Sequence, residues 1–232
     1  MRSWIDLTVA TYAAMVTSRT HWAQAGYRDG EFAAILGHSG KNINGEVYTP
    51  ELGAALTDTL MHPVGQWCML WWPHPTIGAQ TYREAVAWIE QHKPPVDWLP
   101  ERPIFRAVLE GAAAPFFKAC RTRRVVIVGP QHLEALDLFD VARLVPVPKG
   151  DAWKHADELA DEVLQRSRPG DLILVAAGMG ANLIVHRLWP RVHGRATVLD
   201  IGSTLDPYAG VYSRGPFRDE HWQSELMAKN RP

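Results

Sequence analysis

The chain has 232 residues and a formal net charge of -1, from 24 basic and 25 acidic residues. This balance argues against a protein whose main task is to grip nucleic acid, and the length suits one domain, residues 1–232. The two cysteines form no CxxC pair and no cluster with zinc-ligand spacing. Because we find no signal peptide and no apolar run of about 20 residues, we expect a cytoplasmic, intracellular protein without a membrane span.

The first part of the chain, residues 1–64, is expected to be helical. Apolar residues at helical spacing predict a helix from Trp4 to about Arg19. A second helix should begin at Asp29, which can cap it, with Glu31 in its first turn and an apolar run behind. Thr49-Pro50-Glu51 has the pattern of a helix start, and this third helix should reach about residue 61.

Residues 65–205 carry the strands of the predicted fold. An apolar run over 66–72 predicts a buried strand, residues 82–91 predict a helix, and the proline-rich stretch 93–103 predicts a loop. Apolar strands then alternate with helices: strands over 124–130, 142–147, 171–177 and 196–202, and helices over 131–139, 151–166 and 181–189.

Apolar strands that alternate with helices are typical of a parallel sheet covered on both faces. We therefore predict an α/β fold, a Rossmann-like α/β/α sandwich with a mainly parallel, doubly wound sheet. The polar tail, residues 206–232, is expected to fold back on this domain as a helix. Ligands of such folds bind beyond the carboxyl ends of the strands, which points to the turns at Gly129-Pro130, Lys149-Gly150-Asp151, Gly178-Met179-Gly180 and Gly202-Ser203-Thr204.

Two of these turns have features of a nucleotide site. Backbone N–H groups between Gly178 and Asn182 could cradle a diphosphate, although a plain tight turn explains the glycines equally well. Lys149 could neutralise a phosphate and Trp153 could stack on a base, whereas Asp151 by itself is more typical of a helix cap.

Asp29-Gly30-Glu31 places two carboxylates at one helix start. Such a pair can hold a divalent cation or accept hydrogen bonds from sugar hydroxyls. The alternative is a well-capped helix with no further role.

The late motif Val198-Leu199-Asp200-Ile201-Gly202 resembles the first glycine-rich motif of S-adenosylmethionine methyltransferases. The residues that follow lack the expected glycines, and only about thirty residues remain for the further strands that such a fold needs. A methyltransferase therefore stays an alternative.

In their order along the chain, these motifs resemble the GT-D glycosyltransferases, which are built on the DUF1792 domain. That family has an Asp-x-Glu motif in a setting matched here by Asp29-Gly30-Glu31-Phe32. Its later motifs are matched by Val125 to Gly129, by Pro148 to Trp153, by Leu172 to Gly180, and by Asp200-Ile201-Gly202 followed by Asp206 and Tyr208.

Three positions depart from the family pattern. Arg28 stands where the family usually has glycine, Gly26 stands where it commonly has arginine, and Ser203 stands where it has histidine. We hypothesise that Arg28 supplies, from a different position, the charge that Gly26 lacks.

The resemblance implies transfer of a sugar from a nucleotide-sugar, for which a UDP-sugar is the expected donor. It implies Mn²⁺ or Mg²⁺ held by Asp29 and Glu31, which would act in catalysis, and a carboxylate base, Asp206 or else Asp200. The expected nucleotide pocket consists of Arg28, Gly129, Pro130, Lys149, Asp151, Trp153, Gly178, Gly180, Asn182 and Asp200.

The resemblance leaves the acceptor open among a glycan, a glycosylated protein and a modified DNA base. A modified base would suit a viral protein acting in its host cell. A non-catalytic nucleotide- or sugar-binding module is the remaining alternative.

Overall fold

A computed structural model describes residues 7–64, 67–71, 79–99, 102–192 and 194–232. Its centre is a seven-stranded sheet in the order β3-β2-β1-β7-β6-β4-β5, in which every neighbouring pair is parallel. The strands are β1 (Ala23–Tyr27), β2 (Trp67–Trp71), β3 (Asp97–Leu99), β4 (Val125–Gly129), β5 (Val141–Pro146), β6 (Leu172–Val175) and β7 (Thr197–Asp200).

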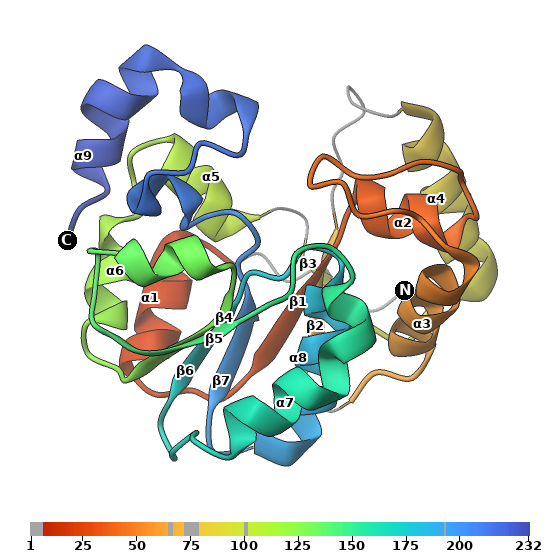
Figure 1. The fold of residues 1–232 in the computed structure, drawn as a ribbon, viewed down its shortest axis with the longest axis horizontal. Helices are drawn as coiled ribbons and strands as arrows, with labels where there is room; N and C mark the ends of the chain where they lie inside the picture. Colours follow the sequence, from red (N-terminus) through yellow and green to blue (C-terminus); the bar gives the residue numbers. More distant parts are fainter. Residues whose placement is uncertain (1–6, 65–66, 72–78, 100–101, 193) are drawn as a thin grey trace.

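Helices cover both faces of this sheet (Figure 1), because alternate strand residues point to opposite sides. Val126 and Val128 of β4 enter one core, whereas Val125 and Ile127 enter the other. The first core is closed by α2 (Asp29–Ile35), α3 (Pro50–Met61), α4 (Ala79–His92), α7 (Ala156–Leu164) and α8 (Gly180–Val192). The second is closed by α1 (Val9–Thr17), α5 (Pro103–Leu109), α6 (Ala114–Cys120) and the C-terminal segment. The predicted α/β/α sandwich is confirmed.

Strand β1 is the largest departure from the sequence-based prediction, which treated residues 1–64 as helical. Ala23 to Tyr27 pair with β2 on one side, and Ala23 and Gln24 pair with β7 on the other, so this strand lies inside the sheet. Its small residues and one glutamine have weak β propensity, and pairing with both neighbours is what makes the segment extended. Gly26 is the residue in this strand that matters most for the site.

Most of the other predicted elements are present with shifted boundaries, and three elements were not predicted. Prolines before and after residues 97–99 hid the short strand β3 in the expected loop, and α5 and α6 were also missed. Two predicted helices are partly or wholly 3₁₀: η1 (Gln131–Ala135), and η2 (Ala152–His155) ahead of α7. The predicted start of the first helix, near Trp4, lies outside the described residues, as do Gln66 and Trp72, the ends of the predicted strand 66–72.

The C-terminal segment folds back onto the domain, as predicted, but in short pieces. These are η3 (Asp206–Ala209), η4 (Gly215–Arg218), the π-helical η5 (Trp222–Leu226) and α9 (Met227–Lys229). Tyr208, Phe217 and Trp222 are buried in the second core. Asn230 fixes the end of the segment, because its amide donates to Val108 O at 2.7 Å and accepts from Ala113 N–H at 2.7 Å.

The chain leaves β1 and β7 toward opposite faces of the sheet. Residues after β1 enter α2 in the first core, whereas residues after β7 enter η3 in the second core. Doubly wound sheets bind their ligands where neighbouring strands diverge in this way. No helix among the described residues is long and apolar enough to cross a membrane.

The close contact between α2 and α3 leads to a stability prediction. A methyl group at Gly53 of α3 would overlap the carbonyl oxygen of Ala34 in α2. Gly53→Ala should therefore lower the free energy of unfolding by about 2 kcal/mol in chemical denaturation, despite the better helix propensity of alanine. Gly215→Ala, where a methyl group meets open space, is the control and should stay within about 0.5 kcal/mol of the parent. Equal losses in both variants would contradict the close packing.

Candidate active site

The centre of the candidate site is Arg28, which directly follows β1 and points toward the end of β7. Its Nη2 lies 3.5 Å from Oδ2 of Asp200, and this carboxylate is 3% exposed. The other oxygen of Asp200 accepts the Gly202 N–H at 2.8 Å. Asp200 therefore holds both the arginine and the turn that follows β7.

Gly26 provides the space for this arrangement. A methyl group at Gly26 would lie 2.7 Å from Arg28 Nη2 and 2.7 Å from Asp200 Oδ2. The guanidinium of Arg28 thus occupies the space into which a side chain at position 26 would project. This geometry supports the hypothesis that Arg28 supplies the charge that Gly26 lacks.

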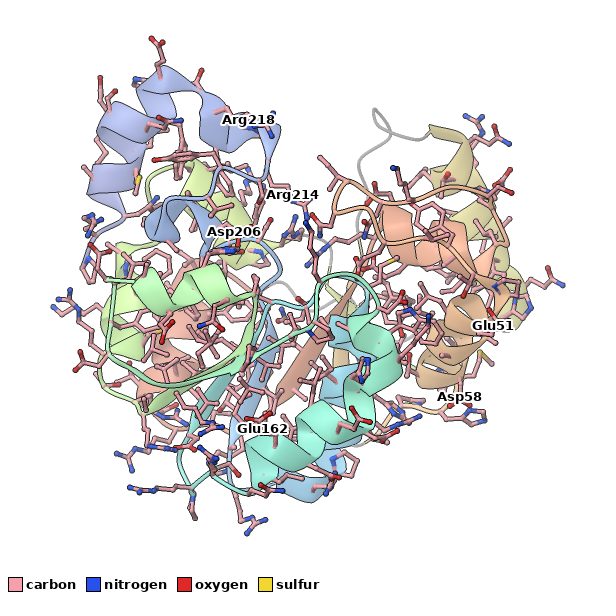
Figure 2. The ribbon with its side chains drawn as sticks, viewed as in Figure 1. Glu51, Asp58, Glu162, Asp206, Arg214 and Arg218 are labelled. Carbon is pink, nitrogen blue, oxygen red and sulfur yellow. The ribbon has the colours of Figure 1, made fainter. Side chains whose placement is uncertain are left out.

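Two arginines that sequence reasoning missed join Arg28. A methyl group at Gly202 would lie 3.0 Å from Arg28 Nη1 and 3.2 Å from Arg102 Nη2, so both guanidinium groups lie against this turn. Arg214 comes from the C-terminal segment, on the side that faces α2 (Figure 2), and its Nε donates to Ser203 Oγ at 2.9 Å. Burial, and next the nearby charge of Arg28, lowers the pKa of Arg102 and of Arg214.

The two carboxylates of the Asp-x-Glu motif have different surroundings. The N-cap of α2 is Arg28 rather than Asp29, so the predicted cap is shifted by one residue. Glu31 is buried and its Oε2 accepts the Arg28 backbone N–H at 2.9 Å, whereas Asp29 is exposed. Burial raises the pKa of Glu31 to about 7, against the opposing effect of Arg28.

The raised pKa of Glu31 predicts how stability depends on pH. Between pH 4.5 and about 7 the folded chain binds more protons at Glu31 than the unfolded chain does, so this residue makes stability fall as the pH rises through that window. Glu31→Gln should remove this contribution and leave the variant more stable than the parent at pH 8, by about 1–3 kcal/mol.

Chemical denaturation at several pH values from 4 to 8 measures this difference. Glu90→Gln, at an exposed position of α4, is the control and should keep the slope of the parent. If Glu31→Gln and the parent give parallel curves, Glu31 does not titrate in this window.

The carboxylates do not fit the predicted metal chelate. Residues two apart in a helix do not share a face, and Glu31 is turned back onto the Arg28 N–H while Asp29 faces solvent. In the described parts of the chain, no group of three or more His, Cys, Asp or Glu side chains could hold a metal ion. Binding of Mn²⁺ or Mg²⁺ stays a prediction that this arrangement does not support.

The glycine-rich turn before α8 does not form the predicted open phosphate cradle. A methyl group at Gly178 would overlap the carboxylate of Glu46, and Glu46 Oε2 accepts the Met179 N–H at 3.2 Å. A methyl group at Gly180 would lie 2.7 Å from the backbone nitrogen of Trp153. The glycines permit close packing, a carboxylate of the chain itself accepts the Met179 N–H, and the N–H groups of Gly180 and Ala181 bond to backbone carbonyls. Asn182 is buried and donates to Gly26 O at 2.8 Å, so it supports β1.

The predicted residues after β5 lie beside this turn. Lys149 and Asp151 are exposed, and the Asp151 carboxylate accepts from Lys154 Nζ at 2.6 Å. Trp153 is half-buried against the first core, with the Lys154 ammonium 5.4 Å from its ring centroid. Asp151 does not cap η2 through its side chain. The role of Lys149 and Trp153 in nucleotide binding stays a prediction.

Gly129 and Pro130 lead into η1, the 3₁₀ helix that carries His132. A methyl group at Gly129 would lie 2.9 Å from Leu133 Cδ1, so Gly129 allows η1 to pack closely. His132 of η1 then places Nε2 3.0 Å from Asp206 Oδ1. The second oxygen of this buried aspartate accepts from Ser213 Oγ at 2.6 Å. The structure thus joins Asp206, the predicted base, to a histidine that the sequence did not single out.

Pockets lie on both sides of Arg28. One is lined by Tyr27, Arg28, Asp29, Phe32, Thr81, Tyr82 and Ala85. The other is lined by Gln24, Arg28, Arg102, Pro103, Ile104, Phe105, Asp200, Ile201 and Thr204. The predicted residues Arg28, Asp29, Glu31 and Asp200 meet in this region, whereas Gly178 and Gly180 line neither pocket.

Neither Arg102 nor Arg214 belongs to a motif that the sequence analysis could use. Each stands beside a proline or glycine in an irregular stretch, Arg102-Pro103 and Arg214-Gly215, and nothing in such a pair marks a site. The only available signal was the position of Arg214 near Asp206 along the chain. Only the tertiary structure brings these two arginines to the same site.

The chain is a doubly wound α/β protein with a parallel sheet, and charged side chains lie beyond the carboxyl ends of its central strands. In proteins of this class, ligands bind at that end of the sheet. No protein-family model and no curated protein matches the chain. Solved structures do match. A DUF1792 glycosyltransferase from Streptococcus sanguinis is 17% identical, with a TM-score of 0.61 over 97% of this chain and 94% of that chain.

Two further structures of the same kind match at similar levels. A DUF1792 domain described as having a distinct glycosyltransferase fold is 15% identical, with a TM-score of 0.60 over 97% of this chain and 90% of its own. A selenomethionine-substituted DUF1792 domain is 16% identical, with a TM-score of 0.59 over 88% and 80% of the two chains. This chain has the fold of the DUF1792 glycosyltransferases, which confirms at the level of the fold the resemblance drawn from the motifs.

Proposed function

We propose that the chain is a glycosyltransferase that moves a sugar from a nucleoside-diphosphate sugar, with a UDP-sugar as the expected donor, to an acceptor hydroxyl. The observation that carries this proposal is the convergence of Arg28, Arg102 and Arg214 at the ends of β1 and β7. Glycosyl transfer expels a diphosphate, and fixed cations at that position stabilise the charge that develops on it. The shared fold with DUF1792 glycosyltransferases supports the same conclusion.

Glycosyl transfer needs groups that stabilise the leaving diphosphate and a base that accepts the proton of the acceptor hydroxyl. The bond between the anomeric carbon and the diphosphate oxygen breaks, and its electron pair leaves with the nucleoside diphosphate. A bond forms between the anomeric carbon and the acceptor oxygen, whose proton passes to Asp206. We prefer Asp206 to Asp200 because Asp200 pairs with Arg28, whereas Asp206 contacts a half-exposed histidine through which a proton can leave.

The acceptor classes remain a glycan, a glycosylated protein and a modified DNA base. The net charge of -1 gives no support to strong DNA binding, so a gel shift with duplex DNA at low salt separates the third class from the others. No observation favours the methyltransferase or the non-catalytic module.

A panel of nucleotide-sugars tests the proposal. The purified chain is incubated with each donor, with Mn²⁺ and separately with a chelator, and released nucleoside diphosphate is measured together with the melting temperature. One donor should raise the melting temperature and be slowly hydrolysed. S-adenosylmethionine and acceptors of the three classes are tested in the same assay. If S-adenosylmethionine alone stabilises the chain, the methyltransferase alternative is correct. If a nucleotide-sugar binds but no acceptor gives turnover, the chain is a binding module.

A further inference from the structure

Three arginines from separate parts of the chain reach one point beyond the sheet. Arg28 follows β1, Arg102 precedes α5, and Arg214 lies in the C-terminal segment. The turn at Gly202 brings the first two together, since a methyl group there would contact Nη1 of Arg28 at 3.0 Å and Nη2 of Arg102 at 3.2 Å. Arg214 contacts the next residue of the same turn, because its Nε donates to Ser203 Oγ at 2.9 Å.

Arg28 and Arg102 line the same pocket, where their guanidinium groups can meet a ligand. Arg28 has one ion pair, at 3.5 Å, and its buried Nε has no hydrogen-bond partner in the described part of the chain. Arg102 stacks its guanidinium 3.9 Å from the ring centroid of Phe105, and Arg214 donates from Nε to Ser203. Crowded guanidinium groups repel one another, and a doubly charged anion between them relieves that repulsion. The fork of N–H groups on arginine matches phosphate oxygens.

The carboxylates beside the arginines are poorly placed to bind a metal ion. Glu31 accepts the Arg28 N–H and is buried, and Asp29 faces solvent. A divalent cation at Asp29 would also lie in the pocket that Arg28 lines, where the guanidinium disfavours a further positive charge. Cations fixed in the protein can stabilise a leaving diphosphate as a bound metal does.

We propose that Arg28, Arg102 and Arg214, rather than a divalent cation, neutralise the diphosphate of the donor, so that this chain binds and transfers without a metal. The inference rests on the proposed function and specifies how the same site holds its donor. As the anomeric bond breaks, the negative charge that appears on the diphosphate is met by hydrogen bonds from the three guanidinium groups. Asp200 keeps Arg28 in position for this contact.

Calorimetric titration of the full chain with nucleoside diphosphates tests the inference. UDP, GDP, ADP and the corresponding monophosphates are titrated in excess EDTA and again with Mn²⁺. UDP should bind in EDTA, Mn²⁺ should change its dissociation constant by less than about threefold, and UMP should bind about tenfold or more weakly because it offers one phosphate to three arginines.

Arginine variants assign the binding to the cluster. Arg102→Met and Arg214→Met should each weaken UDP binding in EDTA by about tenfold or more. Arg218→Met is the matched control, because Arg218 lies in the same segment as Arg214 but is exposed and donates to Tyr212 O (Figure 2). Melting temperatures of all variants show whether each one is folded.

The outcomes separate this inference from the proposed function. Binding of a nucleoside diphosphate only when Mn²⁺ is present overturns the inference and leaves the glycosyltransferase proposal intact. Unchanged binding by both folded arginine variants in EDTA also overturns the inference alone. If no nucleoside diphosphate binds in either condition, both proposals fail.

Discussion

Replacing Asp200 with asparagine is expected to lower the free energy of unfolding by about 3 kcal/mol, the largest loss from any single change in the site. Asp200 is 3% exposed and is the carboxylate paired with Arg28, and its negative charge also favours the charged form of Arg102. Asparagine keeps an oxygen for the Gly202 N–H but removes the charge, so the guanidinium groups of Arg28 and Arg102 are left beside each other without it.

Denaturant unfolding at neutral pH measures this loss of stability. Two further variants test whether it comes from the buried, uncompensated charges. Asp137→Asn removes a carboxylate from an exposed ion pair with Arg231 and should change stability by less than about 1 kcal/mol. The double variant Asp200→Asn/Arg28→Met should recover part of the loss, because it removes one of the uncompensated charges. An Asp200→Asn variant as stable as the parent would show that the carboxylate does not hold the cluster together.

Exchanging the residues at positions 26 and 28 is expected to restore donor binding that the loss of Arg28 removes. Arg28→Gly should weaken UDP binding by about tenfold to a hundredfold, since charged hydrogen bonds to the phosphate are lost. Glycine is tolerated at the N-cap, and Glu31 can still accept the backbone N–H of residue 28. In Gly26→Arg/Arg28→Gly, the new side chain starts in the space that the guanidinium of Arg28 now fills, and the Asp200 carboxylate, 2.7 Å from a methyl group at this position, has to rotate to pair with it.

Calorimetric titration with UDP in EDTA measures the effect of the exchange. The dissociation constant of the double variant should lie within about fivefold of that of the parent. The control is Arg28→Gly/Gln165→Arg, which restores the net charge at the exposed C-cap of α7, outside the arginine cluster. Recovery in both double variants would mean that net charge alone matters. Recovery in neither, with both folded, would contradict the equivalence of positions 26 and 28.

Strands β4 and β6 were predictable because each is a continuous apolar run between turns, as a strand buried on both faces requires, whereas β5 at the sheet edge and β7 carry Arg143 and Asp200 within mainly apolar runs. Residues 125–128 and 172–175 carry this signal by themselves. Strand β1 carries no such signal: Ala23 to Tyr27 has small residues that accommodate neighbours from both sides. A local pattern cannot reveal a strand whose stability comes from partners more than forty residues away.

The glycine-rich turn shows the same limit at the level of the site. Gly178 and Gly180 have the composition of a phosphate cradle, but the structure fills that place with Glu46 and with the backbone at Trp153. Glycines permit close approach without specifying what approaches. Which group arrives, a ligand or a part of the chain itself, depends on a loop more than 130 residues earlier.

The sequence by itself determined the α/β layering, most of the strands of the second half, the carboxylates at the start of α2 and the likeness to DUF1792 glycosyltransferases, since periodicity and motif order are local properties. The tertiary structure decided that Arg28, Arg102, Arg214 and Asp200 gather at the turn after β7, that Asp206 pairs with His132, and that Asp29 and Glu31 face different surroundings. These charges come from distant segments, and only the divergence of the chain at the ends of β1 and β7 brings them together.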